Sequence, residues 1–543
     1  MKMNVPKNLN GNDPNEKISF NLIDEPWIPV TDPLGNSSFV GLHDLFKNAE
    51  SFVDLSLGTL ERIAIIRLLL CIAQRAVNGP EEEEDWNDIR NRIVSDSLEY
   101  LEEKHNRFDL FGDYPFLQIK GLKKSSKSKK KNNVKEESSN KTDKLDFGLA
   151  AGSNTTLFDQ FADKNGRIHS YDWLTRYLLV FQTFSPGGTI GTAEWNEKPI
   201  EKNGSSNDAP GMEGKMLFAL LKGKNLLETI HWNMIAFKRL NDGLRNRIGR
   251  PVWEFDLQNL KESDKEELTS SYLGRLVPLS RTILIDPNRR DMVLANGLTY
   301  PKLPDYREPM AAVYLAKEKK KIVFNYVRTD PDNHPWRQLH SILTYHASSK
   351  EGSPFALEHL SSLFDSDSSS EYCELWTGGI MANKAKIIDT AFWTFSIHKI
   401  SLEEGFLHLY EKGVSLADKA VNRLIKAIKV YLETLKLYSP IQKKTNELYF
   451  AKAKSIFWTA LDQQYLVLIK CAESIPKNTD SLSEWNTLLI KEMKATYEKI
   501  CPHCNARQLQ AFALGDRALH FGEKKKVSKR KNSSLIKGVK KSL

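Results

Sequence analysis

Cysteine is scarce in this 543-residue chain, which has only five, at widely spaced positions: Cys71, Cys373, Cys471, Cys501 and Cys504. Disulfide-dependent secreted domains are far richer in cysteine, so we expect a cytoplasmic protein without a disulfide framework. Long apolar runs are also missing. The most apolar stretch, residues 63–73, is interrupted by Arg67 and is much shorter than the roughly 20 residues of a membrane span. The polar N-terminal segment lacks the apolar core of a secretory signal, so we expect no membrane partner.

Familiar catalytic motifs are absent as well. The chain has no G-x-x-x-x-G-K-[ST] loop, because the pair Gly214-Lys215 lacks the upstream glycine and is followed by Met216. It has no H-E-x-x-H zinc motif, no G-x-S-x-G nucleophile elbow and no kinase signature. Its 12 histidines are dispersed and form no His/Asp cluster of the kind found in metal nucleases. We therefore expect a protein that is not an enzyme and that needs no cofactor.

Positive charge is concentrated in two segments. The chain has 78 lysines and arginines against 69 aspartates and glutamates, which gives a net charge of +9. Residues 523–543 carry +8 and residues 123–144 carry +6, so the rest of the chain is slightly acidic at −5. Net charge bears on association rather than on fold. Overall charge therefore does not by itself indicate a nucleic-acid partner, although the two lysine-rich segments are suited to attract a polyanion.

The hydrophobic pattern predicts an α+β protein with a large mixed N-terminal domain, residues 20–400, and a C-terminal four-helix bundle, residues 401–522. We expect residues 1–19 to be a disordered leader, 123–144 a solvated low-complexity insertion, and 523–543 a basic disordered tail. In the mixed domain we expect a strand over 20–30, strands starting near 281, 311 and 321, and helices over 60–77, 170–184 and 215–237. In the bundle we expect helices over 414–437, 445–474, 481–500 and 506–522, the third opened by a capping box of Ser481 and Glu484.

A glycine-rich segment directly follows the helix expected over 170–184. Its sequence is Ser-Pro-Gly-Gly-Thr-Ile-Gly and contains Gly187 and Gly188. Because glycine has no Cβ, its backbone can lie close to a phosphate or in a groove. The same sequence is also suited simply to end a helix and form a tight turn, so two interpretations remain open.

Two further segments carry residue types that can contact nucleic acid. Asn383 and Lys384 stand at the tip of a β-hairpin predicted over 376–388, which could enter a groove or be an ordinary surface turn. Lys302 lies between two prolines on a stiff loop, from which it could reach a phosphate or a base edge. Surface lysines are common, however, and this one need have no such role.

One motif is compatible with a metal. Cys501, His503 and Cys504 form Cys-Pro-His-Cys, which offers three zinc ligands where a structural site needs four, and no second C-x-x-C exists. A metal-dependent nuclease or zinc protein that uses these residues is one alternative function. A protein that coats nucleic acid non-specifically through its lysine tracts is another.

The N-terminal sequence Asn-Leu-Ile-Asp-Glu-Pro-Trp-Ile-Pro-Val, residues 21–30, resembles the opening of the CasA-type large subunit of the type I-E CRISPR surveillance complex, Cascade. The segment Tyr-Pro-Phe-Leu-Gln at 114–118 is similar to another segment of that family, and residues 144–154 resemble the sequence before its first loop. The glycine-rich segment, the Gly-Gly hairpin and the bundle then follow in the family's order, so the resemblance covers about residues 20–522.

This resemblance implies a non-catalytic subunit that recognises the protospacer-adjacent motif in double-stranded DNA, largely from the minor groove. It also implies that the subunit wedges the duplex open so that the guide RNA can pair and form an R-loop. The implied partners are target DNA, the guide RNA, the backbone, small and guide-end-binding subunits of the complex, and a helicase-nuclease that is recruited in trans.

The resemblance also assigns residues. The family's glycine loop corresponds to Gly187 and Gly188, and its lysine finger, five residues after a glycine, corresponds to Lys302. Its wedge glutamine corresponds to Lys384, beside Asn383; lysine keeps a donor but loses the acceptor. Its first loop, which contacts DNA or other subunits, corresponds to Leu157, Phe158 and Asp159. A cysteine-rich stretch found in some members is absent here, so no metal is implied.

Overall fold

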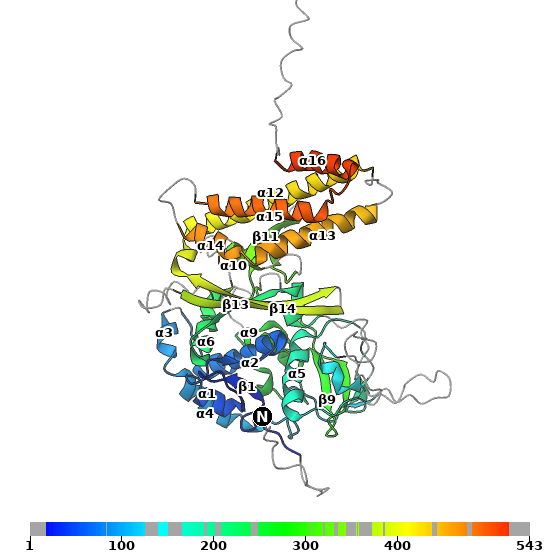
Figure 1. Cartoon of the computed structure of the whole chain (residues 1–543). Helices are drawn as coiled ribbons and strands as arrows, with labels where there is room; N and C mark the ends of the chain where they lie inside the picture. Colours follow the sequence, from blue (N-terminus) through cyan, green and yellow to red (C-terminus); the bar gives the residue numbers. More distant parts are fainter. Residues whose placement is uncertain are drawn as a thin grey trace, which may run out of the picture. The chain divides into compact units, whose positions relative to one another are not determined.

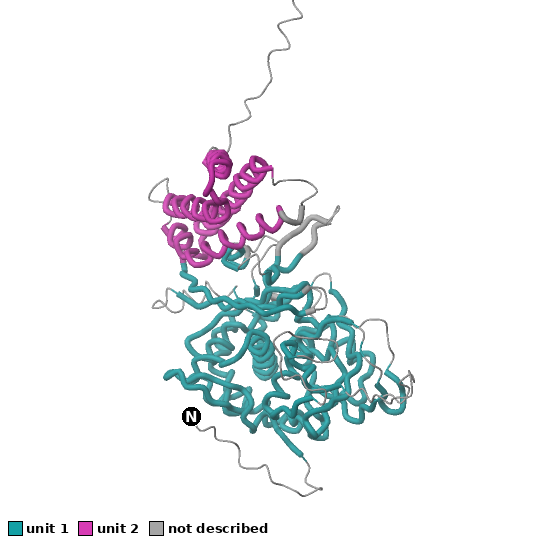
Figure 2. The backbone as a smooth tube through the Cα atoms, turned by 45° about the vertical axis from the view of Figure 1, so that its right-hand side comes forward, with its two compact units in different colours: residues 1–399 teal, residues 400–543 magenta. Residues whose placement is uncertain are grey.

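The computed structural model (Figure 1) describes residues 18–82, 84–124, 140–149, 166–188, 190, 193–200, 208–240, 248–303, 306–318, 321–330, 335–343, 354–355, 357, 372–383, 386–436, 443–474 and 481–520. The chain divides into two compact units, residues 1–399 and 400–543, which Figure 2 colours separately. Its mixture of helices and small sheets confirms the α+β class. Several predicted features lie outside the described residues: 1–17 of the leader, 125–139 of the insertion, the basic tail, Leu157, Phe158, Asp159 and Lys384.

Unit 1 contains all the described strands, which form small antiparallel sheets. The strand orders are β2-β1-β3, β5-β10-β9, β11-β12, β14-β13-β8 and β4-β6-β7. Their bounds are β1 Ile28–Thr31, β2 Ser37–Val40, β3 Asp54–Leu55, β4 Lys123–Lys124, β5 Asn140–Lys141, β6 Ala193–Trp195, β7 Lys198–Pro199, β8 Leu217–Lys222, β9 Arg281–Ile285, β10 Asp291–Asn296, β11 Val313–Glu318, β12 Lys321–Tyr326, β13 Tyr372–Asn383 and β14 Lys386–His398. The strands predicted near 281, 311 and 321 and the hairpin predicted over 376–388 are confirmed.

The helices of unit 1 pack around one core. Their bounds are α1 Leu42–Lys47, α2 Thr59–Val77, α3 Asp85–Ile89, α4 Ile93–Glu103, α5 Tyr171–Phe184, α6 Leu226–Asn233, α8 Glu262–Ser270, α9 Tyr272–Leu276 and α10 Leu339–Leu343, with short 3-10 helices that include η2 Thr142–Leu145 and η3 Pro210–Lys215. Helix α2 is buried at every residue from Ile63 to Gln74, and the two polar side chains in this stretch, Arg67 and Gln74, are hydrogen-bonded. The helices predicted over 60–77 and 170–184 are therefore confirmed as α2 and α5.

Two predictions for unit 1 are wrong. The expected strand over 20–30 begins only at Ile28, because the Asn21 side chain accepts from the Ile23 backbone N–H and folds residues 21–24 into a turn. The expected helix over 215–237 is strand β8 followed by helix α6. Asn225 accepts from the Glu228 backbone N–H and starts the helix there, while the apolar run before it is a buried strand.

The insertion is also shorter than predicted. Lys123–Lys124 pairs with β6, and Asn140–Lys141 pairs with β10. Thr142 and Asp143 are buried in η2, and the Asp143 carboxylate lies 2.6 Å from Nε2 of His169. Average composition over a window conceals this boundary, because the last residues of a polar segment can still make specific buried contacts.

Unit 2 is helical in its described residues. It contains α12 Glu404–Thr434, α13 Lys443–Asp462, α14 Tyr465–Glu473, α15 Ser483–Ile500 and α16 Ala506–His520. The helix predicted over 445–474 is divided into α13 and α14. The predicted capping box is wrong, because Leu482 precedes α15 and makes no side-chain cap. Trp485 donates from Nε1 to the Gly413 carbonyl at 2.9 Å and joins α15 to α12. No helix among the described residues combines the length and the apolar character that a bilayer crossing needs.

Candidate nucleic-acid interface

The glycine loop leaves the end of α5 under local constraints. The Ser185 N–H still donates to the Phe181 carbonyl at 3.0 Å. Beyond it, the Gly187 N–H donates to the Asp208 carboxylate at 2.6 Å. Gly188 has a φ of +149°, which residues with a side chain rarely adopt, and no atom lies within 4 Å of the position of a Cβ there. The loop therefore presents a partly exposed backbone that is fixed on one side.

Arg281, the first residue of β9, fixes the glycine loop through hydrogen bonds. Its buried guanidinium donates to the Pro186 carbonyl at 2.7 Å and to the Ser280 carbonyl at 2.6 Å. Its backbone N–H donates to Oε1 of Gln182 on α5 at 2.8 Å. Burial lowers the pKa of Arg281 to about 10, and the charge of Asp208 opposes this fall. Helix, loop and strand are thus joined through one arginine.

The Lys302 loop leaves β10 against the same strand. A Cβ at Gly297 would lie 2.4 Å from the Arg281 backbone nitrogen, so only glycine permits this approach. The Pro301 carbonyl accepts from Arg275 at 3.3 Å. The next residue, Lys302, is exposed. The loop that carries Lys302 therefore packs against Arg281 through Gly297, and the glycine loop hydrogen-bonds to Arg281.

The hairpin tip is bounded by Asn383 and Lys386, the last paired residues of β13 and β14. The register shifts just before the tip, from Met381 opposite Asp389 to Ala382 opposite Ile387. The Lys215 ammonium donates to the Ala382 carbonyl. The predicted contact residue Asn383 thus follows directly after a carbonyl that a lysine holds.

One segment, residues 208–215, binds the glycine loop and the hairpin and interacts electrostatically with Lys302. Asp208 binds the glycine loop, and Lys215 binds the hairpin. Between them, Glu213 lies 3.4 Å from Arg275 and close to Lys302. Burial raises the pKa of Glu213, and the positive charges of Arg275 and Lys302 oppose this rise. We call residues 208–215 the hub segment.

Sequence reasoning missed the hub segment. In the sequence, Gly214-Lys215 stands out only as an incomplete phosphate-binding motif. The one signal was a Pro-Gly turn with charged residues on both sides, at 208–215. Such a turn is common, and its contacts come from residues far away in the chain.

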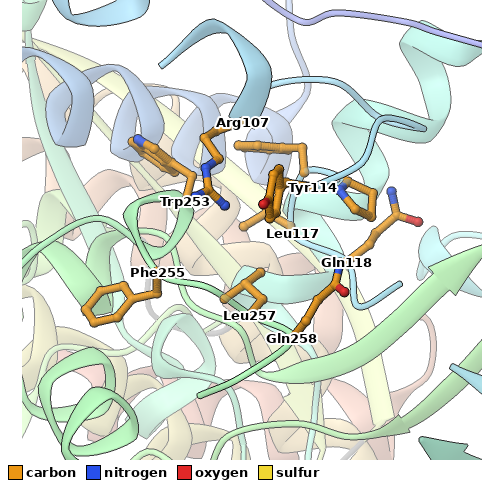
Figure 3. Close-up of a pocket in the computed structure, with 10 residues that line it drawn as sticks. Arg107, Tyr114, Leu117, Gln118, Trp253, Phe255, Leu257 and Gln258 are labelled. Atoms are coloured by element: carbon orange, nitrogen blue, oxygen red, sulfur yellow. The ribbon is translucent and has the colours of Figure 1, made fainter. Parts of the chain in front are cut away.

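The Pro-Phe-Leu-Gln segment has a structural role. Phe116 packs with Phe108 at 5.4 Å between ring centroids, and Gln118 accepts from the Ile285 N–H at 2.8 Å. A cavity of about 20 Å³ lies beside this segment, where the guanidinium of Arg107 covers the Tyr114 ring (Figure 3). A cavity of that size has room for about one water molecule.

The possible zinc ligands in unit 2 differ in their surroundings. Cys501 is buried, and this burial raises the pKa of its thiol to about 12. Cys504 is exposed, and the His503 ring packs against Phe512 at 4.6 Å. Within the described ranges, no three His, Cys, Asp or Glu side chains gather in a way that could hold a metal ion. The geometry therefore gives no support to the metalloprotein alternative.

The chain resembles known proteins over most of its length. A Thermus thermophilus protein described as CRISPR-associated protein CasA/Cse1 is 29% identical over 381 residues, which cover 68% of this chain and 69% of the relative. The crystal structure of CasA from that species superimposes with a TM-score of 0.72 at 23% identity, covering 92% of this chain and 98% of the other. Thermobifida fusca Cse1 gives a TM-score of 0.72 at 21% identity, covering 92% and 96%.

A chain of a CRISPR RNA-guided surveillance complex also has this fold, with a TM-score of 0.70, 15% identity, and coverage of 92% of this chain and 99% of the other. At such identities the likeness concerns the fold alone. The sequence model of one family, CRISPR-associated protein Cse1, matches residues 21–513, almost the whole described chain. The protein therefore belongs to the CRISPR-associated Cse1 family.

Proposed function

We propose that this chain is the large, non-catalytic subunit of an RNA-guided surveillance complex. In that role it recognises the protospacer-adjacent motif in double-stranded DNA, opens the adjacent duplex and helps to recruit a helicase-nuclease that cleaves in trans. It works in the cytoplasm with the guide RNA and with the backbone, small and guide-end-binding subunits. One neighbour in fold is part of an RNA-guided surveillance complex, which supports this setting.

The observation that carries the proposal is the convergence of three elements on the hub segment. The glycine loop, Lys302 and the hairpin come from distant parts of the sequence, yet the loop and the hairpin hydrogen-bond to residues 208–215 and the charge of Lys302 acts on Glu213 in the same segment. A bare glycine backbone, an exposed ammonium and a β-hairpin are together the parts needed to enter a groove and separate strands.

The chemistry of the groove fits these parts. Base edges in the minor groove offer acceptors with little sequence variety, to which the Lys302 ammonium can donate. The backbone at Gly187 and Gly188 can approach the groove because no side chain intervenes. A wedge must then unstack a base step, which costs a few kcal/mol. Pairing with the guide RNA compensates for lost DNA pairing in a nearly balanced exchange, as described for another CRISPR effector.

The test uses the assembled complex and the double variant Lys302→Ala, Lys384→Ala. We expect its affinity for duplex that carries the motif to fall about tenfold or more, since a charge-assisted hydrogen bond contributes about 1.5–3 kcal/mol. Assembly on guide RNA should be unchanged. A matched control is Lys265→Ala, which removes an exposed lysine paired with Glu262 on α8. If a gel-shift titration gives equal affinities for the double variant and the wild type, these lysines do not read the motif.

A further inference from the structure

The hub segment ends in a tightly constrained turn. Gly214 and Lys215 have successive positive φ angles, +61° and +55°. At Gly214 a Cβ would lie 2.9 Å from the Tyr326 ring, so the turn is closed against β12. Lys215 adopts a left-handed conformation that disfavours residues with a side chain. The Lys215 carbonyl accepts from the Thr329 N–H at 3.3 Å, which helps to hold this conformation.

The turn directs the half-buried side chain of Lys215 onto the hairpin. Its ammonium donates to the Ala382 carbonyl, at the point where the ladder between β13 and β14 changes register. A register shift bends the strand and locally disrupts the hydrogen bonds between the two strands. The paired strand therefore defines the direction of its neighbour less firmly at this point. A contact made from outside the hairpin at Ala382 therefore fixes the strand at the point where its ladder is irregular.

Two other residues of the same segment interact with the proposed reading elements. Asp208 binds the Gly187 N–H at 2.6 Å, and Glu213 lies among the charges of Arg275 and Lys302. The interval between Asp208 and Lys215 is short, and η3 fills most of it. The glycine loop and the hairpin are thus joined through a short piece of chain.

We propose that Lys215 is a positioning residue that couples motif recognition to strand separation. It acts on DNA through the hairpin, because its ammonium is engaged by a protein carbonyl. This inference rests on the proposed function. It predicts that loss of the Lys215 contact leaves motif binding intact and impairs opening of the adjacent base pairs.

The test separates these two steps in the assembled complex with Lys215→Met. Binding is measured with a short duplex that carries the motif but has no match to the guide RNA. Opening is measured with a matched duplex that carries 2-aminopurine beside the motif, whose fluorescence rises on unstacking. We expect affinity within about twofold of wild type and opening slowed about tenfold or more, as befits the loss of a charge-assisted hydrogen bond.

Two variants control for general damage. Lys215→Arg keeps a cationic donor and should restore most of the opening rate. Lys265→Met removes an exposed lysine on α8 and should leave both readouts unchanged. If Lys215→Met fails to assemble, Lys215→Gln keeps a neutral donor of shorter reach and should give an intermediate opening rate.

The outcomes are distinct. Opening at the wild-type rate in the Met variant, or in the Gln variant when only that one assembles, overturns the coupling role. An equal loss of binding and opening overturns it as well, because it indicates a merely structural lysine. A wild-type complex that binds duplex without regard to the motif refutes the proposed function itself, whatever Lys215 does.

Discussion

Replacement of Gly297 by alanine should damage the fold and the candidate interface together. A Cβ at this position would lie 2.4 Å from the Arg281 nitrogen and from the Ser280 carbonyl carbon. Ordinary contacts of a Cβ begin at 3.4 Å, so the two backbones must separate by about 1 Å. Both neighbours are backbone atoms at the start of β9, which cannot move aside as a flexible side chain would.

The energetic cost can be worked out from these contacts. Overpacking of this kind costs about 1–3 kcal/mol. Separation also strains the hydrogen bond from the Leu298 N–H to the Leu279 carbonyl, now 3.0 Å, whose net contribution is about 1 kcal/mol. We therefore expect Gly297→Ala to lower the free energy of unfolding by about 2–4 kcal/mol. Because Arg281 also holds the glycine loop, affinity for motif-containing duplex should fall at temperatures where the variant is still folded.

The assay is urea unfolding of the isolated chain, followed by gel-shift titration of the assembled complex. Gly58→Ala is a matched control, since Gly58 has a φ of −66° and its Cβ would meet only the flexible Glu61 carboxylate at 3.2 Å. Gly58 is the N-cap residue of α2, where alanine is less favourable than glycine, so that variant should stay within about 1 kcal/mol of wild type. If Gly297→Ala is as stable as Gly58→Ala and binds DNA normally, the close approach at β9 is not a constraint and the reasoning fails.

Two other changes test the core and the charged tail. Arg67→Met should lower the free energy of unfolding of unit 1 by about 3–5 kcal/mol. The reason is that the Glu308 carboxylate, which lies 2.5 Å from Arg67 and is 2% exposed, would stay buried without its cationic partner. A decrease in the free energy of unfolding of less than about 1 kcal/mol in urea would contradict this. Deletion of residues 523–543 removes a net charge of +8 and should flatten the dependence of DNA affinity on salt while the motif preference persists. Loss of all DNA binding on deletion would instead favour the non-specific coating function.

Local patterns predicted those elements whose own residues determine their shape. Helix α5 starts after Ser170 and ends before Pro186, and both signals are visible in the sequence. The hairpin of β13 and β14 follows from two apolar runs around a polar tip. Strand β8 was not predicted, because a continuous apolar run such as Leu217–Leu221 has no periodicity that distinguishes a buried strand from a buried helix.

The candidate site was only partly predictable for a related reason. Gly187, Gly188 and Lys302 could be selected because a glycine pair and a lysine between prolines are visible in sequence. Their connection through Arg281 depends on hydrogen bonds and packing between residues as many as 95 positions apart. The hub segment has no periodicity of its own, so its role exists only in the folded chain.

The charges around the interface explain why net charge was a poor guide to it. Glu213 lies beside Arg275 and Lys302, Asp208 acts on Arg281, and the Lys215 ammonium is engaged by a carbonyl. Under the proposed function, attraction to DNA at long range falls to the lysine-rich segments outside this cluster, which can raise the rate of encounter without choosing a sequence. Selectivity would then come from a few short-range contacts beside the hub segment. Substitution of Asp208, which binds the glycine loop, should change motif preference with little effect on the salt dependence of binding, whereas loss of the lysine tracts should do the reverse.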